Sequence, residues 1–292
     1  MSQVAVITDS CASLPDDFYD KYGIVSVPYY VNIGTQSYRD LVDITREEFV
    51  DHMRTATELP KSANPGAGDY LEAFRSVATR TDQLLTVCMT SIGSGAYQAA
   101  VLAKELAGKE LPNLRIEVVD TLNVSMAQGW MVLEAARAAK AGATLDHIVA
   151  LVQRMIPVTR MLQTADTLKY LYMGGRIGRA LHLVGSLVNI KPIISMEEGE
   201  ILALGRERSR PRAYRRMMEL MAEQVGARGR IKAAIIHAAD EEAAAALRHM
   251  VGESFECLEL LTSELSTALT VHTGPGTVGV CYFPVKVLDQ GR

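Results

Sequence analysis

In the first half of the chain, strand-length apolar runs alternate with helix-forming patterns. Val4–Thr8, Leu84–Thr90 and Ile116–Thr121 are nearly continuous apolar runs, and Ile24–Ile33 is a longer run of the same kind. Such runs are typical of strands that are buried on both faces of a parallel sheet. Alternation of these strands with helices predicts a parallel-sheet α/β/α domain over residues 1–160.

After about Arg160 the alternation changes. Two strands, Ile190–Met196 and Glu200–Arg206, are joined by a tight turn, and a helix is expected over Arg212–Val225. Three further strand-like pieces close the chain: FECLELL, TALTVH and VGVCYF. The pattern predicts a mixed-sheet α/β domain over residues 161–292, so the expected fold class is a two-domain α/β protein.

The segment from Leu168 to Glu198 breaks its helical pattern at Gly174 and Gly175, and Arg176 follows at once. Glycine tolerates positive φ and allows another backbone to come close, so the pair predicts a helix end that holds one cation in place. The apolar run beyond it is too short to span a membrane. We expect this run to line an enclosed space inside the protein.

Composition excludes several classes of protein. The 292 residues are 48% hydrophobic and 22% charged, the net charge is −4, and aromatic residues make up 6%. These values argue against a nucleic-acid-binding or anionic-membrane-binding surface. The N-terminus lacks a signal-peptide pattern, no segment has the length of a transmembrane helix, and the four scattered cysteines form no CxxC pair. We therefore expect a cytoplasmic protein with reduced thiols and no integral membrane segment.

Common catalytic and cofactor motifs are missing. The sequence holds no GxxxxGK[ST], no GxSxG and no HExxH pattern. Gly274, Gly276 and Gly279 match GxGxxG, but a strand pattern follows where a dinucleotide-binding loop requires a helix. Asp9 and Asp40 fall into no metal-ligand spacing. The sequence predicts no metal and no cofactor on this chain.

Two local features are candidates for chemistry. The SIGSG loop lies between an expected strand and helix, where backbone N–H groups and Ser94 would bind a small anion, although a serine there is also a common helix cap. His272 lies beside a Gly-Pro-Gly turn, where either a structural or a functional role is open. Six arginines crowd GRERSRPRAYRR; most are expected to be solvated, with Arg208 or Arg210 available to an anion or an acidic partner.

Five segments in this order, TDSCASLP, SIGSGAYQAA, LKYLYMGGRI, NIKPII and HTGPG, resemble the motifs of the DegV family of bacterial fatty-acid-binding proteins. The resemblance spans nearly the whole chain. It implies a two-domain α/β protein that buries one long-chain fatty acid between its domains. It also implies that the carboxylate is presented to a separate dihydroxyacetone-kinase-like subunit, which carries ATP and Mg and makes acyl phosphate.

By position, the resemblance assigns carboxylate binding to six residues: Ser62, Gly93, Ser94, Gly95, His272 and Thr273. Arg176 and Arg208 match arginines linked to partner engagement or phosphotransfer. No catalytic residue is expected. This chain departs from the family pattern in the polar, turn-rich loop around Ser62, which reads KSANPGAG, and at Cys11, where threonine is common.

The tail of such a ligand would supply most of the affinity. About fifteen methylenes at ~0.8 kcal/mol each give an upper figure of roughly 12 kcal/mol. Head-group hydrogen bonds supply only ~1–3 kcal/mol apiece. Met173, Leu181, Leu183, Val184 and Leu187 are candidates for the tunnel wall, with ordinary core as the alternative. Neutral hydroxyls would fix the carboxylate and leave it nucleophilic, whereas Arg176 and Arg208 would lie further out.

Two other functions remain open from the residues alone. The first is an enzyme that acts without a partner on an acyl or phosphorylated substrate, using the SIGSG loop with His272 as general acid or base. The second is a regulatory protein that binds nucleic acid through the arginine cluster. The acidic net charge makes the second the weaker of the two.

Overall fold

The first half of the chain forms a four-stranded parallel sheet in the order β2-β1-β6-β7, as predicted. The computed structural model describes residues 3–56, 58–186 and 190–289, without the side chains of 184–186. The strands are β1 (Ala5–Asp9), β2 (Ile24–Val27), β6 (Gln83–Cys88) and β7 (Arg115–Asp120). Every neighbouring pair is parallel, and β6 is almost wholly buried. The continuous apolar runs of the central strands β1 and β6 therefore reflect burial on both faces, whereas the edge strands β2 and β7 are only partly buried.

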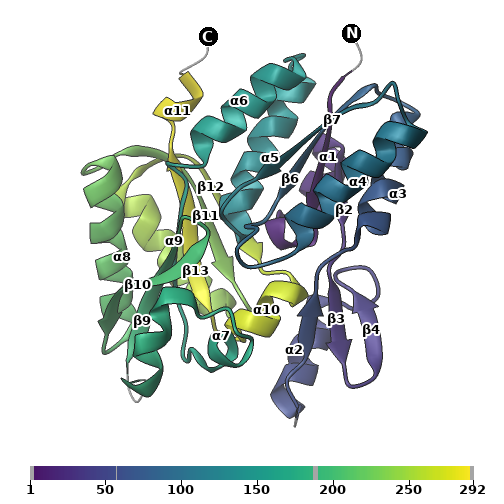
Figure 1. Ribbon diagram of the computed structural model, residues 1–292. Helices are drawn as coiled ribbons and strands as arrows, with labels where there is room; N and C mark the ends of the chain where they lie inside the picture. Colours follow the sequence, from purple (N-terminus) through teal and green to yellow (C-terminus); the bar gives the residue numbers. More distant parts are fainter. Residues whose placement is uncertain (1–2, 57, 187–189, 290–292) are drawn as a thin grey trace.

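Helices flank this sheet in two groups (Figure 1). Helices α3 (Ala67–Ala78) and α4 (Ala96–Glu110) pack together, whereas α5 (Ser125–Lys140) packs against α1 (Asp16–Tyr22) and α6 (Leu145–Met155). This arrangement follows from right-handed crossovers, which place α1 on one face and α3 and α4 on the other.

The second half forms a six-stranded mixed sheet in the order β10-β9-β8-β13-β11-β12. Among its described neighbouring pairs, β11 and β12 are parallel and the others are antiparallel. Its strands are β8 (Arg160–Thr164), β9 (Lys191–Glu197), β10 (Glu200–Glu207), β11 (Arg230–His237), β12 (Glu256–Glu264) and β13 (Val278–Pro284). Helices α8 (Arg210–Val225) and α9 (Glu241–Ser254) pack against it and share one apolar core with it. The mixed α/β architecture confirms the expected fold class.

Helix α5 joins the two halves. It packs on β1 and β6 of the parallel sheet and also on β8, β11 and β13 of the mixed sheet. The indole Nε1 of Trp130 donates to the carbonyl of Cys281 at 3.1 Å. Because the helix is enclosed from both sides, nearly all of its residues are buried, which explains a sequence with little amphipathic character.

The run Ile24–Ile33, predicted as one strand, is divided. Its first part is β2, and its second part, β3 (Tyr30–Ile33), pairs antiparallel with β4 (Gln36–Arg39) and β5 (Lys61–Ala63) in a separate sheet. Pro28 lies at the break, and proline cannot donate to a sheet ladder. The loop around Ser62, expected to lack regular structure, contains β5, which places Ser62 opposite Val31.

The piece TALTVH, predicted as a strand, is the helix α10 (Thr267–Thr273). Ser266 caps it, because its hydroxyl accepts from the N–H of Leu269. The buried carboxylate of Asp40 accepts from the N–H and the hydroxyl of Thr267 at 3.0 and 2.7 Å. A helix this short and buried on every side has no polar stripe, so its periodicity could not be distinguished from that of a buried strand.

The expected boundary at residue 160 coincides with the start of β8, the first strand of the mixed sheet. Helix α10 returns across this boundary to contact α2 (Arg46–Thr55), β3 and β5 of the first half. One hydrophobic cluster also contains residues from both halves. The division into domains at residue 160 stays a prediction. Within the described ranges, no helix combines the length and the apolar character needed to cross a membrane.

Candidate functional site

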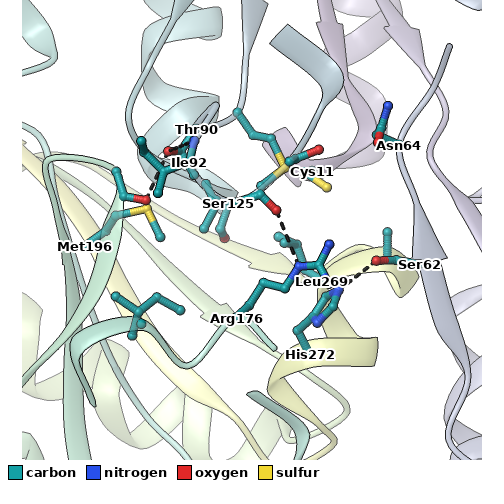
Figure 2. Close-up of a pocket in the computed structure, with 18 of the residues that line it drawn as sticks. Cys11, Ser62, Asn64, Thr90, Ile92, Ser125, Arg176, Met196, Leu269 and His272 are labelled. Atoms are coloured by element: carbon teal, nitrogen blue, oxygen red, sulfur yellow. Dashed lines mark hydrogen bonds between the residues drawn. The ribbon is translucent and has the colours of Figure 1, made fainter. Parts of the chain in front are cut away.

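A cavity of about 610 Å³ lies between the two halves (Figure 2). Its lining comes from the loop after β6, from β5, from α10, from the segment that follows α7 (Lys169–Met173), and from the β9–β10 hairpin. The loop after β6 is at the carboxyl end of a parallel strand, where ligands bind in α/β folds. The volume is within the range of about 300–1,000 Å³ that small-molecule sites occupy.

Apolar side chains form much of the wall. They come from both halves of the chain: Met89, Val124, Met161, Leu171, Met196, Ile201, Leu265 and Leu269. Polar side chains line the cavity as well, among them Ser62 on β5, His272 on α10 and Ser94 in the loop after β6. The cavity thus combines an apolar wall with hydrogen-bonding groups.

The expected wall segment contributes less than predicted. Met173 and Leu181 are 58% and 53% exposed and do not line the cavity. Leu183 packs instead in a separate small core cluster with Leu171. Val184 and Leu187 lie outside the side chains that the structure describes. The segment that begins at Gly178 forms the 3₁₀ helix η2 (Gly178–Ser186), and among its described side chains Ala180 and Leu183 are buried.

Ser94 lies in the SIGSG loop, two residues before Ala96, the first residue of α4. Its hydroxyl oxygen accepts from the N–H of Ala96 at 3.3 Å, so it does support the helix start. The same oxygen lies 2.6 Å from the hydroxyl of Tyr29, and Ser94 also lines the cavity. Capping and cavity-facing roles are therefore combined in one side chain. Gly93 and Gly95 line the cavity beside it.

The loop that carries Ser94 is held by carboxylates at two strand ends. Asp120, at the end of β7, accepts from the N–H of Ser91 at 3.2 Å. Asp9, at the end of β1, accepts from the N–H groups of Cys11 and Met89. Burial raises the pKa of Asp9 to about 6. These aspartates organise the loops, and the described residues include no cluster of three or more potential metal ligands.

Ser62 and His272 point toward each other at the edge of the cavity, and the Ser62 hydroxyl is 2.7 Å from Nε2 of His272 (Figure 2). Burial, and next the positive charge of Arg176, lowers the pKa of His272 to about 4. The imidazole is therefore neutral at pH 7. Its Nδ1 is buried and has no hydrogen-bond partner among the described residues.

This environment selects a tautomer. An unpaired buried N–H is rarer than an unpaired acceptor, which favours the proton on Nε2. Nε2–H then donates to the Ser62 oxygen, and the Ser62 proton is free to point into the cavity. Thr273 also lines the cavity, with its hydroxyl bonded to the carbonyl of Leu269 in the preceding turn.

The two glycine motifs are explained by close packing around His272. A Cβ on Gly174 would lie under 3.0 Å from Nδ1 of His272, and one on Gly274 would lie under 3.0 Å from the ring of Tyr170. Gly274 also has φ of +78°. Helices α7 and α10 can approach this closely only because both positions lack a side chain. GGRI and HTGPG therefore form one packed unit.

The two predicted arginines occupy different positions. Arg176 is exposed at the cavity rim, where Nη1 donates to the carbonyl of Gly174 at 2.8 Å and Nε to that of Gly93 at 3.5 Å. Arg208 is exposed and does not line the cavity. Arg210 is engaged internally with Asp166, Asp240 and the carbonyl of Gly276. It is therefore not available to an external anion.

Two contributors were not among the predicted site residues. Tyr29 contacts Ser94, and the hydroxyl of Thr90 donates to the carbonyl of Gly199 at 3.1 Å, which joins the loop after β6 to the β9–β10 hairpin. Tyr29 lies in an apolar run, where a tyrosine is usually core. Its role follows only from the three-dimensional structure, which brings Tyr29, just before β3, into contact with Ser94, just ahead of α4.

The family model described as "Uncharacterised protein, DegV family" matches residues 3–285. The chain belongs to the DegV family. A DegV domain-containing protein of Caldanaerobacter subterraneus subsp. tengcongensis is 32% identical over 282 residues, 97% of this chain and 99% of the relative. One of Deinococcus radiodurans is 31% identical over 97% of this chain and 99% of its own length.

Solved structures of DegV proteins match the whole fold. A Thermus thermophilus DegV family protein, described as fatty acid binding, has a TM-score of 0.90 at 32% identity, with 97% of this chain and 100% of that chain covered. A DegV lipid-binding protein from Thermotoga maritima has a TM-score of 0.87 at 27% identity, with 97% and 99% covered. In this DegV protein, the SIGSG, GGRI and HTGPG segments all meet at the cavity.

Proposed function

We propose that this chain is a non-catalytic carrier that binds one long-chain fatty acid in the cavity between its two halves. The observation that carries the proposal is the joining of an extended apolar cavity to a cluster of neutral hydroxyl and imidazole groups at Ser62, Ser94 and His272. The Thermus and Thermotoga relatives, described as fatty acid binding and lipid binding, support the same ligand class.

The polar cluster suits a carboxylate that must still react. With His272 neutral, the described lining carries a full charge only at Arg176 and Glu200, and Arg176 lies at the rim. Hydroxyl donors fix the head group without the charge neutralisation that a bidentate arginine clamp would cause. The carboxylate therefore keeps its nucleophilic character for acyl-phosphate formation.

The ligand itself is the direct test of this proposal. Protein purified from a bacterial host and then denatured is expected to release about one equivalent of fatty acid, identified by mass spectrometry. Delipidated protein should take up oleate with the same stoichiometry. Failure of folded, delipidated protein to bind any fatty acid of 14 to 18 carbons would remove the proposal.

We further propose that a separate dihydroxyacetone-kinase-like subunit phosphorylates the bound carboxylate with ATP and Mg, and that Arg176 and Arg208 engage it. The supporting observation is that both cations are exposed, with Arg176 at the rim of the cavity. The kinase partner and a cytoplasmic location stay predictions.

Arg176→Ala is expected to lower acyl-phosphate formation with the kinase subunit by about tenfold or more, because it removes one charge-assisted contact. Oleate affinity should fall by less than the transfer rate does, because Arg176 is exposed and its charge, although close enough to lower the pKa of His272, is screened by solvent. Arg179→Ala is the matched control, because Arg179 is exposed nearby but does not line the cavity. ATP or acyl-phosphate turnover by the chain alone would instead favour the stand-alone enzyme.

A further inference from the structure

Tyr29 is a buried tyrosine whose hydroxyl reaches the polar cluster of the cavity. Its side chain is 4% exposed and it lines the cavity beside Ser94. The backbone fixes its position from two sides, because its N–H donates to the Ser10 hydroxyl at 3.0 Å and its carbonyl accepts from the N–H of Asp40 at 2.8 Å. The ring is therefore held where its hydroxyl lies 2.6 Å from the Ser94 oxygen.

The hydrogen-bond capacity of Ser94 determines what this contact does. A serine hydroxyl has two acceptor positions and one proton. The N–H of Ala96 occupies one acceptor position. If Tyr29 donates to the other, both are filled and the Ser94 proton must point elsewhere, toward the cavity.

The direction of the Tyr29–Ser94 bond follows from acidity and burial. A phenol, with an ordinary pKa near 10, is a stronger donor than an aliphatic hydroxyl. Burial raises the pKa of Tyr29 further, so it stays protonated at every physiological pH. If the bond ran the other way, the buried phenol proton would be left with the Cys11 sulfur, which is only a weak acceptor. When Tyr29 donates to Ser94, the phenol proton has a good acceptor and the Ser94 proton points into the cavity.

We infer that Tyr29 is a positioning residue that orients and polarises the Ser94 hydroxyl as a donor to the carboxylate of the bound fatty acid. The inference rests on the proposed carrier function and adds a residue to it. Ser94 then resembles Ser62, whose hydroxyl lies 2.7 Å from Nε2 of His272 and accepts from it when the proton is on Nε2. In each case the aromatic ring donates a hydrogen bond to the serine oxygen, which leaves the serine proton free to point into the cavity. Hydrogen bonds linked in this way strengthen one another.

Tyr29→Phe removes only the hydroxyl and keeps the ring. It is expected to weaken oleate binding by about three- to tenfold, the net value of one hydrogen bond. Binding of oleyl alcohol, which has the same tail and an uncharged head group, should weaken by less than about twofold, since neutral acceptors gain less from a polarised donor. The matched control is Tyr70→Phe, because Tyr70 is equally buried in the same half but does not line the cavity.

A double-mutant cycle separates positioning from packing. In a Ser94→Ala background, adding Tyr29→Phe should cost less than about twofold in oleate affinity, because the donor that Tyr29 orients is already gone. Three results would overturn the inference: unchanged oleate binding by Tyr29→Phe, equal losses for oleate and oleyl alcohol, or additive losses in the double variant. Failure of the wild-type protein to bind oleate would refute the carrier function instead, so the two failures are distinguishable.

Discussion

Gly274→Ala is expected to lower the free energy of unfolding by about 3 kcal/mol or more. Gly274 has φ of +78°, where alanine is strained, and the added Cβ would lie under 3.0 Å from the ring of Tyr170. At φ +78° and ψ 159°, a region that is essentially restricted to glycine, the backbone strain costs about 1–3 kcal/mol, and forced repacking typically costs about 1–3 kcal/mol more. Tyr170 belongs to α7, so relief of the clash must push α7 away from α10.

The chain offers a matched control at Gly226, which ends α8. Gly226 has φ of +86° and ψ of 159°, against +78° and 159° for Gly274, but a Cβ there would meet nothing within 4 Å. Gly226→Ala should therefore cost only the backbone strain, about 1–3 kcal/mol. Urea unfolding of both variants gives the two values. Equal losses would show that the α7–α10 contact contributes nothing.

The same pair of variants connects stability to the site. Gly274 follows His272 by two residues, and Gly174 on α7 packs directly against the His272 ring. Displacement of α7 should therefore loosen the Ser62–His272 hydrogen bond and weaken oleate binding in Gly274→Ala. Gly226→Ala should bind oleate as the wild type does. The glycines at positions 174 and 274 thus support the site because they allow the close packing that holds His272 in place.

The layered architecture was predictable because burial on both faces produces a continuous apolar run. That signal placed all four strands of the parallel sheet. It failed at Ile24–Ile33, since one apolar run in the sequence can supply two strands that belong to different sheets. It failed again at α10, where enclosure on every side removes the polar face that marks a helix.

The site was predictable where a motif specifies a backbone geometry. GGRI and HTGPG contain glycines that close packing requires, and their residues meet those of SIGSG at the cavity. Tyr29 could not be found in this way, because its role depends on a contact with Ser94, 65 residues away. The apolar wall was misplaced for a similar reason. Met196 and Leu269 line it from elements that are far apart in the sequence.

The neutral state of His272 makes folding stability depend on pH. Burial and the nearby Arg176 lower its pKa from 6.5 to about 4 in the folded protein. The unfolded chain therefore binds a proton at a higher pH than the folded protein does. The corresponding stability is fully present above pH 6.5 and is lost as the pH falls toward 4, with a total of about 3 kcal/mol.

His272→Gln removes this titration and should flatten the pH dependence. Asp9 acts in the opposite sense, because burial raises its pKa to about 6 and acid therefore favours the folded state. The wild-type curve alone combines the two groups, so the informative quantity is the difference between the unfolding free energies of wild type and variant at each pH. That difference should shift by about 3 kcal/mol between pH 7 and pH 4, measured by urea unfolding. A constant difference across this range would mean that the pKa of His272 is the same in the folded and unfolded protein. The proposal that neutral His272 donates from Nε2–H to Ser62 would then be unsupported.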